Sequence, residues 1–152
     1  MATRIDRFER IADYYRQRKD AEVGRLHRIR RLRSERELLL KRSLRKRQDF
    51  INSCTGRLSG RINTAGIAGI EGSMQYLKME IARVRDELDK ALKLERNQRE
   101  QVIQADIQRR VWEKLVRRKK KQATQRESSR NSKLMDDLAL SRKRAVRSRE
   151  LI

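Results

Sequence analysis

Few residues of this chain could do chemistry of their own. The 152 residues include one histidine, His27, and one cysteine, Cys54, too few for a cysteine-rich zinc site or for a base beside a nucleophile. The adjacent carboxylates Asp136 and Asp137 could hold a metal ion, but a solvated helix face accounts for them more simply. We therefore expect no catalytic residue, no metal site and no cofactor, and a protein that is not an enzyme.

Basic side chains are the chemical groups that stand out. Lys and Arg number 42 against 21 Asp and Glu, which gives a formal net charge of +21. They gather in residues 28–36, 41–47, 117–121 and 142–149. Such a density can neutralise nucleic-acid phosphates, or it can steer a protein toward an acidic groove on a partner.

The distribution of this charge favours the protein partner. Residues 1–58 carry 18 basic and 8 acidic groups, a net +10, and residues 73–152 carry 23 and 12, a net +11. The basic groups thus surround the whole chain rather than forming one stripe, and few aromatic residues are available for base stacking. A basic coiled-coil protein that binds nucleic acid remains the alternative, with non-specific binding possible in either case.

Two long helices must carry these groups. The chain has no proline, so helices can run without interruption. We expect a first helix at about 4–58, a glycine-rich connection at about 59–72 and a second helix at about 73–148, with Ser73 as its N-cap. Because a modest connection folds such helices back on each other, we predict an all-α fold. We expect the two helices to form an antiparallel coiled-coil hairpin and residues 1–152 to form a single domain.

An apolar seam supports the coiled coil in the second helix. Its spacing alternates between three and four residues, as a coiled coil requires. The predicted seam residues are Met74, Leu77, Ile81, Val84, Leu88, Ala91, Glu95, Gln98, Val102, Ala105, Arg109, Trp112, Val116, Lys119 and Ala123.

The first helix has a less regular seam. Polar residues interrupt it at Lys19, Glu22, Arg33 and Arg36, which suggests local register changes or splaying. We predict the seam residues Ile5, Phe8, Ala12, Tyr15, Leu26, Ile29, Leu40, Leu44, Arg47, Ile51, Cys54 and Leu58.

The second helix is the longer one, so part of it should lack a partner. We expect the paired part to end within the polar stretch 123–133. Beyond that stretch, Leu134, Leu138 and Ala145 would form an apolar stripe, either a docking surface or part of a frayed tail. The sequence has no apolar run near the ~18 residues of a membrane span, so we expect no membrane insertion.

Several segments together resemble one family. They are residues 5–11 (IDRFERI), the glycine-containing middle, 74–77 (MQYL), 112–115 (WEKL) with the basic run after it, and 135–139 (MDDLA). In this order they resemble the flagellar export protein FliJ and its type III secretion counterparts of the YscO kind. The residues fit a flagellar and a virulence system equally.

The resemblance implies a function and its partners. Proteins of this kind form a coiled coil similar to the central gamma stalk of rotary ATP synthases, bind the hexameric export ATPase, and link it to the membrane export gate and to secretion chaperones. Such a protein would be cytoplasmic and peripheral to the inner-membrane export apparatus. Carried over to this chain, the export-gate-binding residues would be Tyr76, Leu77 and Met79, although Leu77 is also a seam residue. The ATPase-binding residues would be Arg7, Arg10, Arg16, Arg18, Lys133, Arg142 and Lys143.

Overall fold

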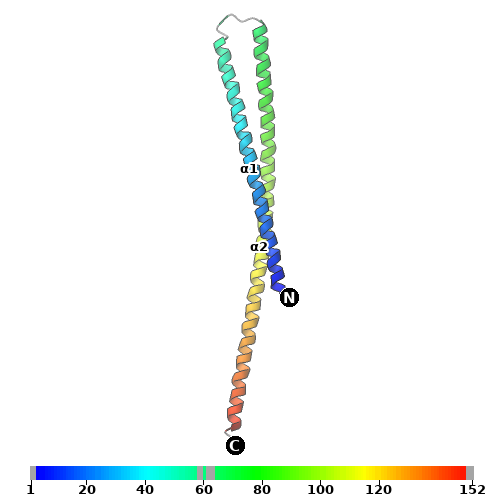
Figure 1. Cartoon of the computed structure of the whole chain (residues 1–152), viewed down its shortest axis with the longest axis vertical. Coiled ribbons are helices and arrows are strands. Elements are labelled where there is room, and N and C mark those ends of the chain that lie inside the picture. Colours follow the sequence, from blue (N-terminus) through cyan, green and yellow to red (C-terminus); the bar gives the residue numbers. More distant parts are fainter. Residues whose placement is uncertain (1–2, 58–59, 61–63, 150–152) are drawn as a thin grey trace. The chain divides into compact units, whose positions relative to one another are not determined.

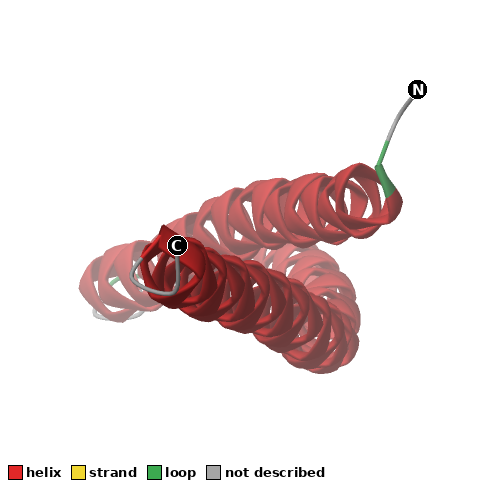
Figure 2. Ribbon diagram, turned by 90° about the horizontal axis from the view of Figure 1, so that it is seen from below, coloured by secondary structure: helices red, strands yellow, loops and turns green. Residues whose placement is uncertain are grey.

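The chain forms an all-α helical hairpin, as predicted. A computed structural model describes residues 3–57, 60 and 64–149. Helix α1 spans Arg4–Arg57 and helix α2 spans Thr64–Arg149 (Figure 1). Within these described ranges there is no strand (Figure 2).

The helices pair within two compact units. The terminal unit consists of α1 up to Arg18 and α2 from Asp106 onward, and the middle unit consists of Lys19–Ala105. In each unit a segment of α1 lies beside a segment of α2 that runs in the opposite direction (Figure 1). Each unit therefore has its own side-chain seam.

The predicted seam of α2 is confirmed at every position. All fifteen of its residues are buried or half-buried, from Met74 to Ala123. The most deeply buried include Ile81, Val84, Ala91 and Ala105, together with the charged residue Glu95. Every described residue after Ala123 is exposed, so the paired part ends where the sequence predicted.

The seam of α1 keeps a seven-residue period without a break. Lys19, Glu22, Arg33 and Arg36 all stay on the half-buried face, so the polar residues do not shift the register within the described part of α1. Two positions of this period differ from the prediction, since Ser43, at 4% exposure, and the half-buried Phe50 occupy it instead of their neighbours Leu44 and Ile51, which are also half-buried. Ser43 fits there because its hydroxyl donates a hydrogen bond to Glu80 across the seam, at 3.3 Å.

The predicted connection is too long. Helix α2 begins at Thr64 rather than Ser73, so Ser73 lies inside the helix and does not cap it. No described glycine has a positive φ, and Gly66, Gly69 and Gly72 belong to α2. A glycine costs a helix only about 1 kcal/mol relative to alanine, which a long helix tolerates. The predicted seam residue Leu58 lies outside the described residues, as do 59 and 61–63.

A capping box fixes the start of α1. The backbone N–H of Asp6 donates to the hydroxyl of Thr3 at 3.2 Å, and the backbone N–H of Thr3 donates to the Asp6 carboxylate at 2.5 Å. Both donors would otherwise lack a partner within the helix. The Thr3 backbone hydrogen bond lowers the pKa of Asp6, with help from the Thr3 side chain. This cap was not predicted from the sequence.

Candidate functional site

An aromatic cluster holds the terminal unit together. Trp112 of α2 lies between two rings of α1, with its centroid 6.2 Å from that of Phe8 and 5.8 Å from that of Tyr15. The Tyr15 and Trp112 planes are 11° apart, so these rings are stacked. Such pairs contribute about 0.5–1.5 kcal/mol beyond their buried area. The cluster fixes α1 against α2 and so positions the charged residues around it.

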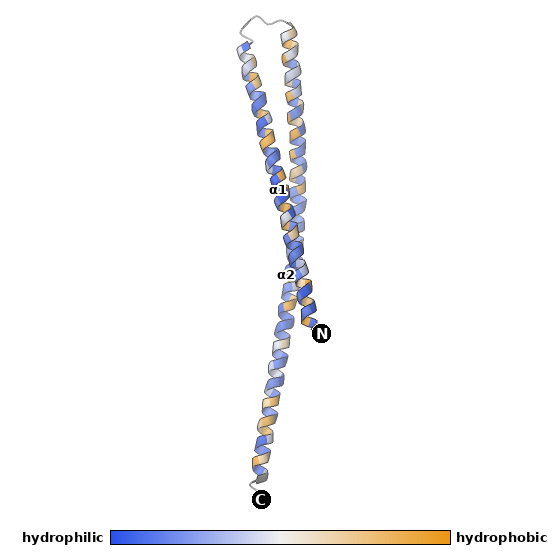
Figure 3. Ribbon diagram, viewed as in Figure 1, coloured by the Kyte–Doolittle hydropathy of each residue, from blue (hydrophilic) through white to orange (hydrophobic). Residues whose placement is uncertain are grey.

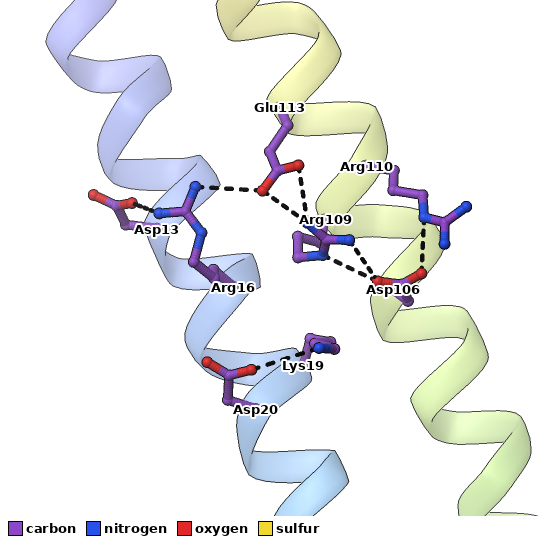
Figure 4. Close-up of polar contacts among 8 residues, drawn as sticks. All are labelled: Asp13, Arg16, Lys19, Asp20, Asp106, Arg109, Arg110 and Glu113. Atoms are coloured by element: carbon purple, nitrogen blue, oxygen red, sulfur yellow. Dashed lines mark hydrogen bonds and ion pairs between the residues drawn. The ribbon is translucent and has the colours of Figure 1, made fainter.

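Ion pairs run along one side of this aromatic cluster. Arg16 of α1 contacts Asp13 at 2.8 Å and Glu113 of α2 at 3.3 Å (Figure 4). Arg109 contacts the same Glu113 at 2.9 Å and Asp106 at 2.8 Å. Burial raises the pKa of Glu113, but the hydrogen bonds from Arg109 and Arg16 outweigh it, and the net pKa is lowered.

Two further contacts extend the row. Lys120 of α2 pairs with Glu9 of α1, and Arg110 pairs with Asp106 at 2.8 Å. Hydrogen bonds to Asp106 and Glu113 raise the pKa of Arg109, so this guanidinium stays charged. On this side Arg16, Arg109, Arg110 and Lys120 are already paired with carboxylates of the chain itself.

The predicted ATPase-binding residues all lie in the terminal unit and are all exposed. Of these seven, Arg16 is held in the ion pairs described above. The other six make no ion pair with any residue that the structure describes. They form two groups. Arg7, Arg10 and Arg18 lie on the paired part of α1, whereas Lys133, Arg142 and Lys143 lie on α2 after the seam has ended.

The part of α2 past the seam carries exposed apolar residues as well. Leu134 and Leu138 are exposed, as the predicted stripe requires, and so is Ala145. Met135, Leu140 and Val146, which were not part of the predicted stripe, are exposed too. Figure 3 shows this alternation of hydrophobic and hydrophilic residues toward the C-terminal end of α2. Basic and apolar groups thus occupy the same helical segment.

The predicted gate-binding residues lie in the middle unit and fall into two kinds. Tyr76 and Met79 are 68% and 65% exposed and are available to a partner. Leu77 is a half-buried seam residue, and seam packing accounts for it.

A buried acid forms the polar centre of the middle unit. Glu95 is 3% exposed, and its carboxylate contacts Arg30 at 3.3 Å, Arg33 at 3.1 Å and Arg99 at 2.7 Å. Burial raises the pKa of Glu95, but the hydrogen bonds from Arg99 and Arg30 and the charge of Arg33 leave it lowered overall. The sequence marked Glu95 as a polar seam position but did not identify its partners.

Gln98 adds a second polar contact between the helices of this unit. Its amide donates to the backbone carbonyl oxygen of Glu22 at 3.1 Å and to the Glu22 carboxylate at 2.5 Å. These two polar positions, Glu95 and Gln98, therefore favour the observed pairing of α1 with α2 in this unit.

Among the described residues, no group of three or more His, Cys, Asp or Glu side chains is placed to hold a metal ion. None of their helical stretches is long and apolar enough to cross a membrane.

Comparison with known proteins identifies the family. A search of the curated proteins found no match, and neither did a search of the solved structures. A family model described as flagellar FliJ protein matches residues 4–148, nearly the whole of both helices. The chain therefore belongs to the flagellar FliJ family and is a component of the flagellar export apparatus.

Proposed function

We propose that this protein is a stalk-like component of the flagellar export apparatus, which binds the hexameric export ATPase and links it to the membrane export gate. It catalyses no reaction of its own and acts in the cytoplasm, peripheral to the inner membrane. The observation that carries this proposal is the terminal unit, in which α2 continues past its pairing with α1 and exposes basic and apolar side chains.

The charge of the terminal unit supports binding to the ATPase. Arg7, Arg10 and Arg18 on α1 and Lys133, Arg142 and Lys143 on α2 are exposed and make no ion pair with a described residue. Unpaired cations attract an acidic partner surface and raise the association rate. Arg16 contributes less than the others, because it is already paired with Asp13 and Glu113.

Exposed side chains of the middle unit support a second contact. Tyr76 and Met79 present large apolar surfaces to solvent, and residues of these types are enriched at protein interfaces. We assign them to the export gate, with Leu77 supporting them from the seam. Secretion chaperones are further partners, for which no particular surface is assigned.

An ATP hydrolysis assay with the purified export ATPase tests the proposal. The wild-type protein should stimulate hydrolysis at physiological salt, and Arg142→Glu with Lys143→Glu should reduce the stimulation. The matched control is Arg83→Glu with Arg85→Glu, which reverses two exposed charges of α2 in the middle unit. Stimulation that is absent in the wild type, or equally reduced in both double variants, would contradict the proposal.

The net charge of +21 favours a second candidate function, binding to nucleic acid. Such binding depends on phosphate neutralisation and weakens steeply with salt. Titration of duplex DNA at increasing salt separates the two candidates. Tight DNA binding at physiological salt, without any effect on the ATPase, would support nucleic-acid binding over the stalk.

A further inference from the structure

The seam of the terminal unit has two flanks of different chemistry. On each helix, residues that directly follow a seam residue project to one side of the seam, and residues that directly precede one project to the other side. Glu9 and Arg16 follow Phe8 and Tyr15, and they pair with Lys120 and Glu113, which follow Lys119 and Trp112. The following residues of both helices thus share one side, which we call the ion-paired flank.

The opposite side, which we call the apolar flank, carries exposed hydrophobic residues. Ile11 and Tyr14 precede the seam residues Ala12 and Tyr15 of α1, and Val111 and Leu115 precede Trp112 and Val116 of α2. Tyr14 is 59% exposed and Val111 is 50% exposed, while Ile11 lies at the surface and Leu115 is half-buried. Hydrophobic residues of both helices therefore lie on one flank, outside the seam.

Charge separates the two flanks further. Every acidic residue within 4–18 and 106–123 directly follows a seam residue and lies on the ion-paired flank; these are Asp6, Glu9, Asp13, Asp106 and Glu113. The apolar flank has no acid over these ranges. It does carry Arg7, Arg18 and Arg118, which are exposed and make no ion pair with a described residue.

We propose that the terminal unit contacts the export ATPase through its apolar flank, and that this flank receives an amphipathic helix of the ATPase with aliphatic side chains bordered by Asp and Glu. The inference rests on the proposed function, of which it specifies the contact face. Aliphatic residues of the helix would cover Tyr14 and Val111, and its carboxylates would meet the unpaired arginines. The ion-paired flank is unsuited to such a partner, because its own carboxylates would repel the added acids.

Two adjacent arginines provide a matched test. Arg118 precedes Lys119 and lies on the apolar flank, whereas Arg117 follows Val116 and lies on the ion-paired flank; both are exposed. Arg118→Glu should weaken binding to the purified ATPase by about tenfold, which corresponds to about 1.4 kcal/mol. Arg117→Glu makes the same charge change one residue away and should leave the affinity within about twofold, since Arg117 lies outside the proposed contact face.

An apolar pair repeats the comparison without changing a basic residue. Val111→Asp places a charge on the apolar flank and should weaken binding, whereas Ile107→Asp places one on the outer face of α2, where Ile107 is exposed, and should not. Helical content from circular dichroism confirms that each variant folds. Equal losses for Arg117→Glu and Arg118→Glu, or for the two aspartate variants, would overturn the inference and leave the proposed function standing. A wild-type protein that does not bind the ATPase would instead refute the proposed function, and the inference with it.

Discussion

Tyr15 is stacked on Trp112, with ring centroids 5.8 Å apart and planes 11° apart. The contact joins α1 to α2 in the terminal unit and involves the only tryptophan of the chain. Trp112 fluorescence therefore reports directly on whether this unit is paired.

Replacing Tyr15 should loosen the terminal unit. Tyr15→Ala removes the stacked ring and leaves a gap beside Trp112, which we expect to cost about 2 kcal/mol, less than for a fully buried aromatic residue. Trp112 emission should shift to longer wavelength, and its urea midpoint should fall. Ile107→Ala of the same unit is the control, because Ile107 is largely exposed. An unshifted Trp112 spectrum in Tyr15→Ala would mean that the stacking does not hold the helices together.

The buried charge of Glu95 should stabilise the middle unit only together with its partners. Glu95→Gln keeps the shape but leaves Arg30 and Arg99 without a counter-charge and Arg33 with Glu37 alone, at 3.5 Å, so the Tm measured by thermal melting should fall by several degrees. Glu95→Leu should be less harmful, since leucine fills the seam while the partly exposed arginines turn to water. Glu100→Gln is the matched control at an exposed position of the same helix. A glutamine variant as stable as the wild type would contradict this account.

Acid should weaken the terminal unit through Glu113. Its folded pKa lies below the ordinary value near 4.5, so its stabilising effect is complete above that value and disappears as the pH falls through the folded pKa. Urea midpoints of the wild type should therefore drop as the pH falls below about 4.5. In Glu113→Gln the drop should be smaller, because no carboxylate is left there to protonate. Parallel pH profiles for the two proteins would exclude Glu113 as the group responsible.

The seam could be predicted from the sequence because it depends on local periodicity. A residue such as Ala91 falls on the buried face whatever its partner is, since spacing along one helix decides its direction. Ser43 was missed for the opposite reason. Its burial depends on Glu80 of the other helix, and a lone serine at a seam position gives no apolar signal.

The candidate site was predicted only in part. Exposure of Arg7, Arg10 and Arg18 followed from their charge, but the pairing of Arg16 with Glu113 joins residues 97 positions apart. That pairing depends on the antiparallel register, which composition does not specify. The two unlike flanks of the terminal unit became visible only after the register had placed Ile11 and Val111 on the same side.

The cap of α1 offers a local test of helix stability. Thr3→Ala removes the hydroxyl that accepts the Asp6 backbone N–H, which should cost about 1 kcal/mol. Hydrogen exchange should speed up in the first turns of α1 and remain unchanged elsewhere. Thr124→Ala is the control, because the Thr124 hydroxyl bonds only to the Lys120 carbonyl inside α2, and alanine is the better helix former there. Unchanged exchange in Thr3→Ala would show that the cap does not hold this end.

Glycines at the start of α2 test the corrected helix boundary. Neither Gly69 nor Gly72 has a positive φ, so other residues can adopt the same backbone conformation. A Cβ added at either position would meet nothing within 4 Å. Gly69→Ala and Gly72→Ala should each stabilise the protein by about 0.5–1 kcal/mol, because alanine lowers the conformational entropy of the unfolded chain and has the higher helix propensity. Gly60→Ala lies outside both helices and should not raise the helical content. If the two helical substitutions instead lower Tm, the segment 64–72 is not helix, and the glycine-rich connection extends to Gly72 as its composition first suggested.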